Sequence, residues 1–266
     1  MKKITFSAIL LGVIFLACQK NAITGRRSLS LIPESELIGM SLTEYDKFLK
    51  EHVPLPALDK NTILVRGVGV KIQHAVEKYY ADKGLSSQLN GFQWEFNVVQ
   101  ENVVNAWCMP GGKVVVYTGL LPVTQDEASL AIVMGHEIAH AVAGHGNQRM
   151  SQGMIVQFGG AVLSTAMQQK PQITQQLFGQ AYGLTTGLGM LKYSRKHETE
   201  ADKMGLIFAA MGGYNPEVAI GFWERMAASS GGQKPPEILS THPSDETRIS
   251  ALKAFMPEAK KYYNPK

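Results

Sequence analysis

Residues 135–141 read Gly-His-Glu-Ile-Ala-His-Ala, which places His136 and His140 four residues apart with Glu137 directly after the first. In a helix, positions four apart lie about 40° from each other on one face, one turn above the other. The two imidazoles can therefore share one metal ion. This H-E-x-x-H spacing on one helix face predicts a metal site.

The sequence around this motif predicts a buried helix. Thr124 and Glu127 have the spacing of a capping box, which predicts Thr124 as the N-cap, and residues 128–143 contain no proline. Most other residues of this helix are apolar, so we expect it inside the domain. Two buried imidazoles and a buried carboxylate need partners, and one metal ion supplies them. The alternative is a pair of core histidines that are hydrogen-bonded without a metal.

A catalytic zinc takes three protein ligands and a water molecule, so one ligand must come from elsewhere. His145 is a poor candidate, because it lies about 140° round the helix from His140. We interpret His145 as a residue that ends the helix or that supports a ligand.

A second predicted helix, downstream, offers carboxylates. Glu198 and Asp202 share one face of it, and Ala201 and Gly205 lie on the same face, so its backbone can approach the motif helix closely. This face predicts Glu198 as the third ligand and Asp202 as the acceptor of the free N–H of a ligating histidine. Glu200 points away from it and is interpreted as a solvated surface charge.

The first residues predict export. Lys2 and Lys3 precede an uncharged stretch over residues 4–17, which predicts a signal peptide over residues 1–17. The run Phe-Leu-Ala-Cys that ends at Cys18 resembles a bacterial lipobox, so we expect Cys18 to be lipidated. The alternative is a plain secretory signal. Because Gln19 and not aspartate follows, resemblance to Gram-negative lipoproteins predicts a lipid anchor in the outer membrane with the domain in the periplasm, the alternative being a soluble periplasmic protein.

Composition limits the remaining classes. The formal net charge is +4, and no basic run of the kind that binds phosphates is present, so nucleic acid is not an expected partner. The second of the two cysteines is Cys108, so a lipidated chain would have no disulfide. The predicted elements, in order, are helices over 33–51 and 58–82, a strand over 94–98, a strand, turn and strand over 103–118, the motif helix, helices between 150 and 190, and the helix of Glu198.

Four motifs together resemble metallopeptidase family 48, which includes the HtpX, BepA, LoiP and CAAX-protease types, and Thr24-Gly25-Arg26-Arg27 is similar to the start of its lipoprotein branch. The resemblance covers roughly residues 23–255. The motifs are the H-E-x-x-H helix, the Ser-Arg-x-x-Glu-x-x-x-Asp segment that ends at Asp202, Asn105-Ala106 before Pro110-Gly111-Gly112, and His242-Pro243 with Arg248 six residues beyond the histidine.

The resemblance implies a mainly helical α+β fold with a zincin-like (gluzincin) core and a small antiparallel sheet beside the motif helix. It divides the chain into a signal peptide (1–17), a lipidated N-terminus with a helical lead-in (18–57) and a zinc metallopeptidase domain (58–266). It also implies one zinc ion per chain, and that His242 and Arg248 face the metal, where they steady the reacting carbonyl or cover the ion in a resting state. The implied zinc ligands are His136, His140 and Glu198, with Glu137 as base and Asp202 behind a ligand. For His242 the alternative is a residue that merely precedes a helix, and for Arg248 a solvated helix charge.

Residues 103–107 are predicted to form the sheet edge beside the cleft, where Asn105 and Ala106 would bind the substrate backbone as an added strand. Trp107 and Met109 are equally well explained as core residues. This mode of binding suits unfolded segments, so we predict an endopeptidase for misfolded or unassembled envelope proteins.

Two departures limit the resemblance. The membrane spans of the HtpX and CAAX types are missing, so prenylated substrates are not implied. The BepA type docks on an assembly machine through a C-terminal repeat domain, and few residues follow Arg248 here.

Two other function classes compete with the endopeptidase. One is a metal-binding chaperone or assembly lipoprotein with little or gated proteolytic activity, because His242 occupies the open position. The other is a lipid-anchored interaction protein with structural zinc, which has no use for Glu137. The expected partners are unfolded envelope proteins, the membrane through the N-terminal lipid, and either an oligomer or the outer-membrane assembly machinery.

Overall fold

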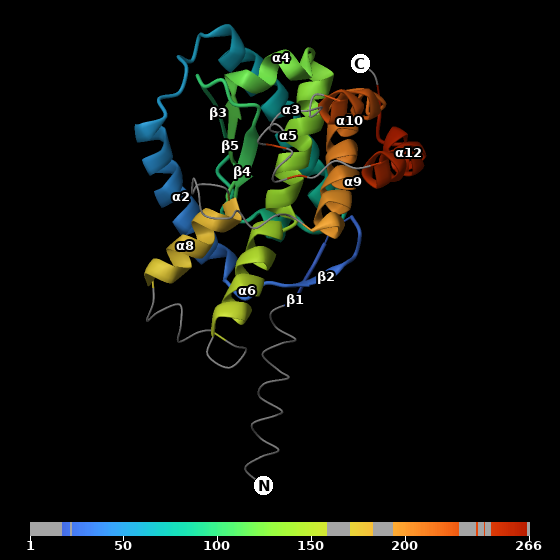
Figure 1. Ribbon diagram of the computed structural model, residues 1–266. Helices are drawn as coiled ribbons and strands as arrows, with labels where there is room; N and C mark the ends of the chain where they lie inside the picture. The colour runs from blue at the N-terminus through green and yellow to red at the C-terminus, as the bar shows by residue number, and fades with distance from the viewer. Residues whose placement is uncertain are drawn as a thin grey trace.

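The computed structural model describes residues 18–21, 23–158, 171–182, 194–228, 238, 242 and 246–264, and the predicted signal peptide lies outside them. Figure 1 shows helices gathered around a small sheet, with β1 and β2 at one end of the molecule. The elements are β1 (Cys18–Lys20), β2 (Arg27–Leu29), α2 (Glu34–Glu51), α3 (Lys60–Asp82), η1 (Ser86–Leu89), β3 (Glu95–Val99), β4 (Ala106–Met109), β5 (Lys113–Tyr117), η2 (Thr118–Leu120), α4 (Leu121–Thr124), α5 (Glu127–Val142), α6 (His145–Phe158), α8 (Pro171–Tyr182), α9 (Arg195–Met211), α10 (Val218–Ala228) and α12 (Glu246–Lys260).

The predicted class, a mainly helical α+β fold with a small sheet beside the motif helix, is confirmed. Helices α2 and α3 begin and end within two residues of their predicted ranges. Of the helices predicted between 150 and 190, the described part of the chain contains α8 and α6, and α6 begins earlier than predicted, at His145. Among the described residues, no helix is both long enough and apolar enough to span a membrane.

The three-stranded sheet is mixed, so the predicted antiparallel arrangement is wrong for one pair. The strand order is β3-β5-β4, and β5 pairs parallel with β3 and antiparallel with β4. After β3 the chain crosses to the far edge before it forms the β4–β5 hairpin, so β5 enters the middle of the sheet in the direction of β3. Gly111 and Gly112 close the hairpin turn, each at φ 84°, a left-handed conformation that glycine adopts without strain.

Both faces of the sheet are covered. Successive residues of a strand point to opposite faces. Val114 and Val116 of β5 belong to the main core with residues of α3, α5 and α9, whereas Val115 belongs to a second core with residues of α2 and α8. Burial on both sides explains why β5 is apolar at consecutive positions, and the sheet packs against α5 through β4.

The motif helix α5 has a different cap from the predicted one. Thr124 ends the short helix α4, and Asp126 caps α5 by accepting a hydrogen bond from the Ser129 amide at 2.6 Å. Gln125, at φ 67°, separates the two helices. The prediction of Thr124 was wrong because residues 121–124 form a helical turn of their own, and aspartate caps a helix as well as threonine does.

Helix α9 packs along α5 and carries the predicted carboxylates. Ser194 caps α9 by accepting a hydrogen bond from the His197 amide at 3.2 Å, and the helix ends before Gly212, as predicted. Gly135 of α5 and Gly205 of α9 meet where the two helices cross. Because neither residue has a side chain, the two backbones come close enough for short carboxylates to reach across.

Candidate metal centre

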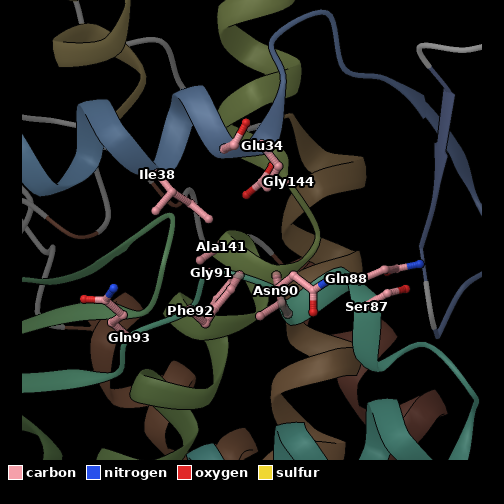
Figure 2. Close-up of a pocket in the computed structure, with 12 residues that line it drawn as sticks. Glu34, Ile38, Ser87, Gln88, Asn90, Gly91, Phe92, Gln93, Ala141 and Gly144 are labelled. Atoms are coloured by element: carbon pink, nitrogen blue, oxygen red, sulfur yellow. The ribbon is translucent and has the colours of Figure 1, made fainter.

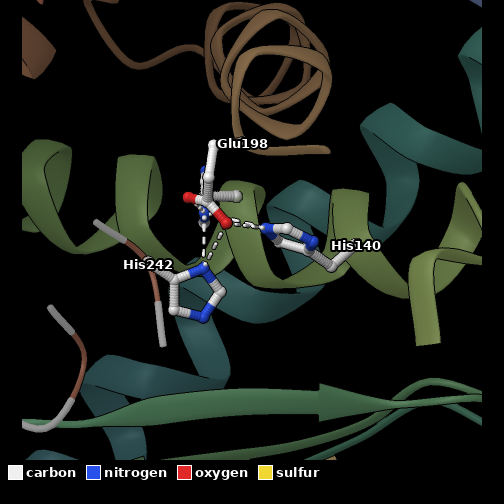
Figure 3. Close-up of side chains that lie close together, drawn as sticks. His140, Glu198 and His242 are labelled. Atoms are coloured by element: carbon white, nitrogen blue, oxygen red, sulfur yellow. Dashed lines mark hydrogen bonds and ion pairs between the residues drawn. The ribbon is translucent and has the colours of Figure 1, made fainter. Parts of the chain in front are cut away.

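Four buried side chains from three parts of the chain meet between α5 and α9. They are His136 and His140 of α5, Glu198 of α9, and His242, and one nitrogen or oxygen of each lies within 4.8 Å of the others. Figure 3 shows the Glu198 carboxylate directed toward the imidazoles of His140 and His242. The structure therefore brings together the three residues that the sequence predicted as ligands, and adds His242 to them.

The separations of the ligand atoms suit a small tetrahedral ion. The Nε2 atoms of His136 and His140 are 3.0 Å apart. Glu198 Oε2 lies 3.4 Å from His136 Nε2, and Glu198 Oε1 lies 3.5 Å from His140 Nε2. Ligands about 2.0 Å from a zinc ion at tetrahedral angles are about 3.3 Å apart. No large rearrangement is needed for these three residues to hold such an ion.

Asp202 lies behind the first ligand, where the sequence placed it. Its Oδ1 is 3.0 Å from His136 Nδ1, so the carboxylate can accept the N–H that faces away from the other ligands. Arg248 grips the same carboxylate with Nε and Nη2, at 2.6 and 2.7 Å. The guanidinium also stacks on the Trp223 ring, 3.7 Å from its centroid. Arg248 is 4% exposed, which rules out its interpretation as a solvated helix charge.

The charge states of two ligands favour metal binding. Burial raises the pKa of Glu198, but the neighbouring His242 and His136 outweigh it and hold the pKa well below its usual range. Burial, reinforced by His136 and His242, holds the pKa of His140 well below its usual range. Glu198 is therefore a carboxylate and His140 a neutral imidazole, which are the forms that coordinate a metal.

The site also attracts positive charge. Burial and Arg248 lower the pKa of His136, yet the carboxylates of Asp202 and Glu198 outweigh them and raise it to about 9, so a metal ion that binds here would displace a proton from Nε2. Two buried oxygens, Glu137 Oε1 and Glu198 Oε2, have no hydrogen bond to the described residues, although Glu198 Oε2 forms an ion pair with Arg248 at 3.1 Å. A cation would satisfy these atoms, and two imidazoles with one carboxylate are the donor set of a catalytic zinc site.

Glu137 lies beside the cluster, and among the described residues no donor forms a hydrogen bond with its Oε1. It is 3% exposed, and its Oε1 is 3.6 Å from His242 Nε2. Burial raises the pKa of Glu137, although the nearby His242 and His136 act against it. A carboxylate whose pKa is shifted toward neutrality is suited to accept a proton and to return it.

His242 stands among the ligand atoms. Its Nδ1 lies 3.2 Å from His136 Nε2 and 3.1 Å from Glu198 Oε1. Its backbone amide donates to the carbonyl of Ile238 at 2.8 Å. The side chain therefore takes up the space next to the three predicted ligands.

Strand β4 is an edge strand, as predicted, and the protein's own chain occupies part of that edge. The Ile238 amide donates to the carbonyl of Val104 at 3.2 Å, and Asn105 Oδ1 accepts from the Ala106 amide at 2.9 Å. Asn105 and Ala106 are both buried, and Met109 is a fully buried core residue. A substrate strand at this edge would have to displace Ile238.

The interpretation of Glu200 as a solvated charge was wrong. Glu200 is 3% exposed. His145 lies between it and a predicted ligand: His145 Nε2 is 3.1 Å from Glu200 Oε2, and His145 Nδ1 is 2.9 Å from His140 Nδ1. Thr24 and Arg26 cover Glu200 from the N-terminal side. The sequence of α9 gives no sign of this burial, because the residues that cover Glu200 lie far from it in the chain.

A cavity of about 750 Å³ lies apart from the metal cluster, between the start of α2, η1 and the end of α5. Figure 2 shows Ile38 and Phe92 among the side chains that line it, with Glu34 and Asn90. None of the four clustered residues lines this cavity. Because those residues are 1–4% exposed, the candidate metal centre is closed.

The model of a known protein family matches most of the chain. The model of peptidase family M48 matches residues 70–256, a range that contains every residue of the cluster together with Glu137, Asp202 and Arg248.

Named proteins are similar to this chain as well. "Mitochondrial metalloendopeptidase OMA1" of Arabidopsis thaliana is 38% identical over 183 residues, which are 68% of this chain and 35% of the relative. "Metalloendopeptidase OMA1, mitochondrial" of Homo sapiens is 31% identical over 265 residues, which are 97% of this chain and 49% of the relative. The "Beta-barrel assembly-enhancing protease" of Escherichia coli is 29% identical over 165 residues, 59% of this chain and 33% of the relative. The chain thus spans between a third and a half of the length of these relatives.

Proposed function

The chain belongs to peptidase family M48, and from this membership and the geometry of the site we propose that the protein is a zinc-dependent metalloendopeptidase. The observation that best supports this is the convergence of His136 Nε2, His140 Nε2 and the Glu198 carboxylate at 3.0–3.5 Å, with Glu137 beside them. A structural zinc site has no role for such a carboxylate.

Each residue has a distinct task in peptide hydrolysis. His136, His140 and Glu198 would hold one zinc ion, which as a Lewis acid polarises a peptide carbonyl and acidifies water. Glu137 takes the proton of the attacking water and hands it to the leaving amine, so that the amine departs uncharged. Asp202 keeps His136 in the tautomer whose Nε2 lone pair faces the ligand cluster, and Arg248 fixes Asp202.

For the substrate we propose extended segments of misfolded or unassembled proteins of the bacterial cell envelope. Backbone pairing with the edge of β4, near Asn105 and Ala106, would select an extended conformation and not a particular side chain. The name of the Escherichia coli relative places that protein at β-barrel assembly. An envelope location for this chain agrees with the lipobox-like sequence before Cys18, which predicts a lipid anchor on the periplasmic face of the outer membrane.

One observation favours a second candidate, a metal-binding assembly factor whose proteolytic activity is gated. His242 Nδ1 lies 3.2 Å from His136 Nε2, and Ile238, four residues earlier, takes up the Val104 carbonyl at the strand edge. Ile238 thus lies on the proposed substrate edge and His242 beside the ligands. In this candidate the protein binds zinc and hydrolyses peptides only when these two residues move away.

The test is a cleavage assay on the purified protein with an unfolded model protein, together with elemental analysis. We expect one zinc ion per chain, cleavage of the unfolded protein, loss of cleavage with a zinc chelator and recovery on re-addition of zinc. A protein that contains no zinc and binds none contradicts the proposal. A zinc-loaded protein that cleaves only after His242→Ala supports the gated candidate instead.

A further inference from the structure

A row of buried polar side chains runs from one predicted ligand to the N-terminal part of the chain. It begins at His140 Nδ1, which is 2.9 Å from His145 Nδ1, and continues from His145 Nε2 to Glu200 Oε2 at 3.1 Å. Arg26 then reaches Glu200 Oε2 with Nε at 2.7 Å, and the Thr24 hydroxyl donates to the other oxygen of the carboxylate. His140, His145 and Glu200 are at most 3% exposed, so water does not substitute for these contacts.

The hydrogen bonds in this row determine which ring nitrogen of His145, and then which ring nitrogen of His140, carries the hydrogen. A carboxylate only accepts, so the His145 nitrogen that faces Glu200 must carry a hydrogen. In a neutral imidazole the other nitrogen, His145 Nδ1, is then an acceptor, and it faces His140 Nδ1. His140 must therefore donate through Nδ1, which leaves its Nε2 lone pair directed at His136 and Glu198.

The other ligand histidine has an equivalent support. Asp202 faces His136 Nδ1 directly, at 3.0 Å. On His140, an imidazole stands between the carboxylate and the ligand, because Glu200 lies two residues after Glu198 and so on the far side of α9. Each ligand histidine thus has a carboxylate that determines its tautomer, one in direct contact and one through His145.

The N-terminal loop holds the far end of the row. Asn21 Oδ1 accepts from the amides of Ile23 and Thr24 at 2.8 and 2.9 Å, which shapes the loop, and Asn21 Nδ2 reaches Met204 Sδ on α9 at 3.2 Å. Thr24 and Arg26 then meet Glu200. Thr24 and Arg26 belong to the Thr24-Gly25-Arg26-Arg27 motif, which precedes residue 70, where the match to the family model begins.

We propose that Glu200 and His145 are positioning residues that hold His140 in its metal-binding tautomer and orientation, and that Asn21, Thr24 and Arg26 of the N-terminal loop keep Glu200 in place. The inference rests on the proposed zinc site. It makes the N-terminal segment a functional part of the metal centre. Outer carboxylates of this kind typically contribute about 10–100-fold to metal affinity.

The first test measures zinc affinity by competition with a chromophoric chelator. We expect Glu200→Gln and His145→Leu each to weaken zinc binding about 10–100-fold. His145→Gln is expected to recover much of the loss, because its side-chain amide donates to Glu200 and accepts from His140, whereas leucine fills a similar volume and does neither. Glu224→Gln is the matched control: Glu224 is a helix carboxylate paired with Lys253 at the surface, and its loss should leave zinc affinity unchanged.

A purely structural role for His145 gives a different result. In that case His145→Gln and His145→Leu bind zinc equally well, and the proposal is wrong. Wild-type affinity in both Glu200→Gln and His145→Leu overturns it as well. If Glu200→Gln fails to fold, the comparison of the two His145 variants still decides, since they differ only in hydrogen bonding.

The second test needs no metal and so separates the inference from the proposed function. In two-bond ¹H–¹⁵N spectra of the zinc-free protein, we expect His140 to carry its hydrogen on Nδ1, and we expect a tautomer mixture in His145→Leu. A wild-type His140 protonated on Nε2 overturns the inference. A wild type that binds no zinc but has the Nδ1 tautomer overturns the proposed function and leaves the positioning role of His145 supported.

Arg26 provides the third test. Arg26→Gln removes the guanidinium from Glu200 but leaves His145 and Glu200 in place, so we expect a smaller loss of zinc affinity, less than about tenfold. Arg27→Gln is the control, because Arg27 is exposed on β2. An equal effect of the two substitutions contradicts the role of the loop.

Discussion

Gly135 of α5 and Gly205 of α9 lie backbone to backbone, so closely that a Cβ on Gly205 would be 2.8 Å from the amide nitrogen of His136. A Cβ on Gly135 would be 2.9 Å from the Gly205 carbonyl oxygen. The atoms in the way are backbone atoms of two buried helices, and they cannot move independently. This crossing sets the distance between the histidines of α5 and the carboxylates of α9.

Gly205→Ala should therefore destabilise the protein and weaken zinc binding together. We expect a loss of about 1–3 kcal/mol in the free energy of unfolding, which is typical of an overpacked core. Urea unfolding of the zinc-free protein measures it. The control is Gly67→Ala, at an exposed position of α3 with nothing within 4 Å of the new Cβ, where alanine should stabilise the helix by about 0.5–1 kcal/mol. If Gly205→Ala and Gly67→Ala had the same free energy of unfolding, α5 and α9 could move apart without loss of stability, which would contradict the prediction.

Glu137→Gln tests the proton transfer. The side chain keeps its shape but cannot accept a proton, so we expect cleavage to fall by about 10²–10⁴-fold while one zinc ion per chain is retained. Because burial raises the pKa of Glu137, the neutral glutamine should not lower the melting temperature. Cleavage at the wild-type rate would contradict the assignment of Glu137 as the base.

Arg248→Lys tests the bidentate hydrogen bonding of Arg248 to the Asp202 carboxylate. An ammonium group cannot reproduce the two contacts at 2.6 and 2.7 Å or stack on Trp223. We expect zinc affinity to fall by about tenfold or more, measured by chelator competition. Arg225→Lys, an exposed substitution on α10, is the control and should have no effect. Unchanged affinity in Arg248→Lys would mean that Asp202 holds its position without the guanidinium.

His242→Ala distinguishes a cover from a catalytic contact. If His242 covers the metal centre, its removal opens the site, so a chelator should extract zinc faster and the unfolded substrate should be cleaved faster. This is the outcome we expect, because His242 Nδ1 lies within 3.2 Å of both His136 Nε2 and Glu198 Oε1. Slower cleavage with unchanged zinc extraction would instead assign His242 to the reacting carbonyl.

Cys18→Ala tests the anchor. We expect the wild-type protein in the membrane fraction of a Gram-negative host, with a lipid on Cys18 found by mass spectrometry of the N-terminal peptide. The variant should move to the soluble fraction with its zinc affinity unchanged. An unmodified Cys18, or Gln19 as the first residue, would contradict lipidation.

The local geometry of single helices could be derived from the sequence. His136 and His140, four residues apart, had to share a face of α5, and Glu198 and Asp202 had to share a face of α9, because the helical repeat alone fixes those angles. The apolar composition of α5 also predicted that it is buried on nearly all sides. The sequence therefore predicted the three ligands, the adjacent base and the supporting carboxylate, which the structure places together.

Contacts between distant segments were decided by the tertiary structure alone. Whether two strands pair parallel or antiparallel depends on which edge of the sheet the chain reaches after β3. The burial of Glu200 depends on Arg26, which is 174 residues away. His145 connects Glu200 to His140 only because α6 begins where α5 and α9 run side by side. A repeat of 3.6 residues per turn predicts which side chains share a helix face. It does not predict how one helix packs against another or which loop covers the two helices, and this packing and this loop determine which charges are buried.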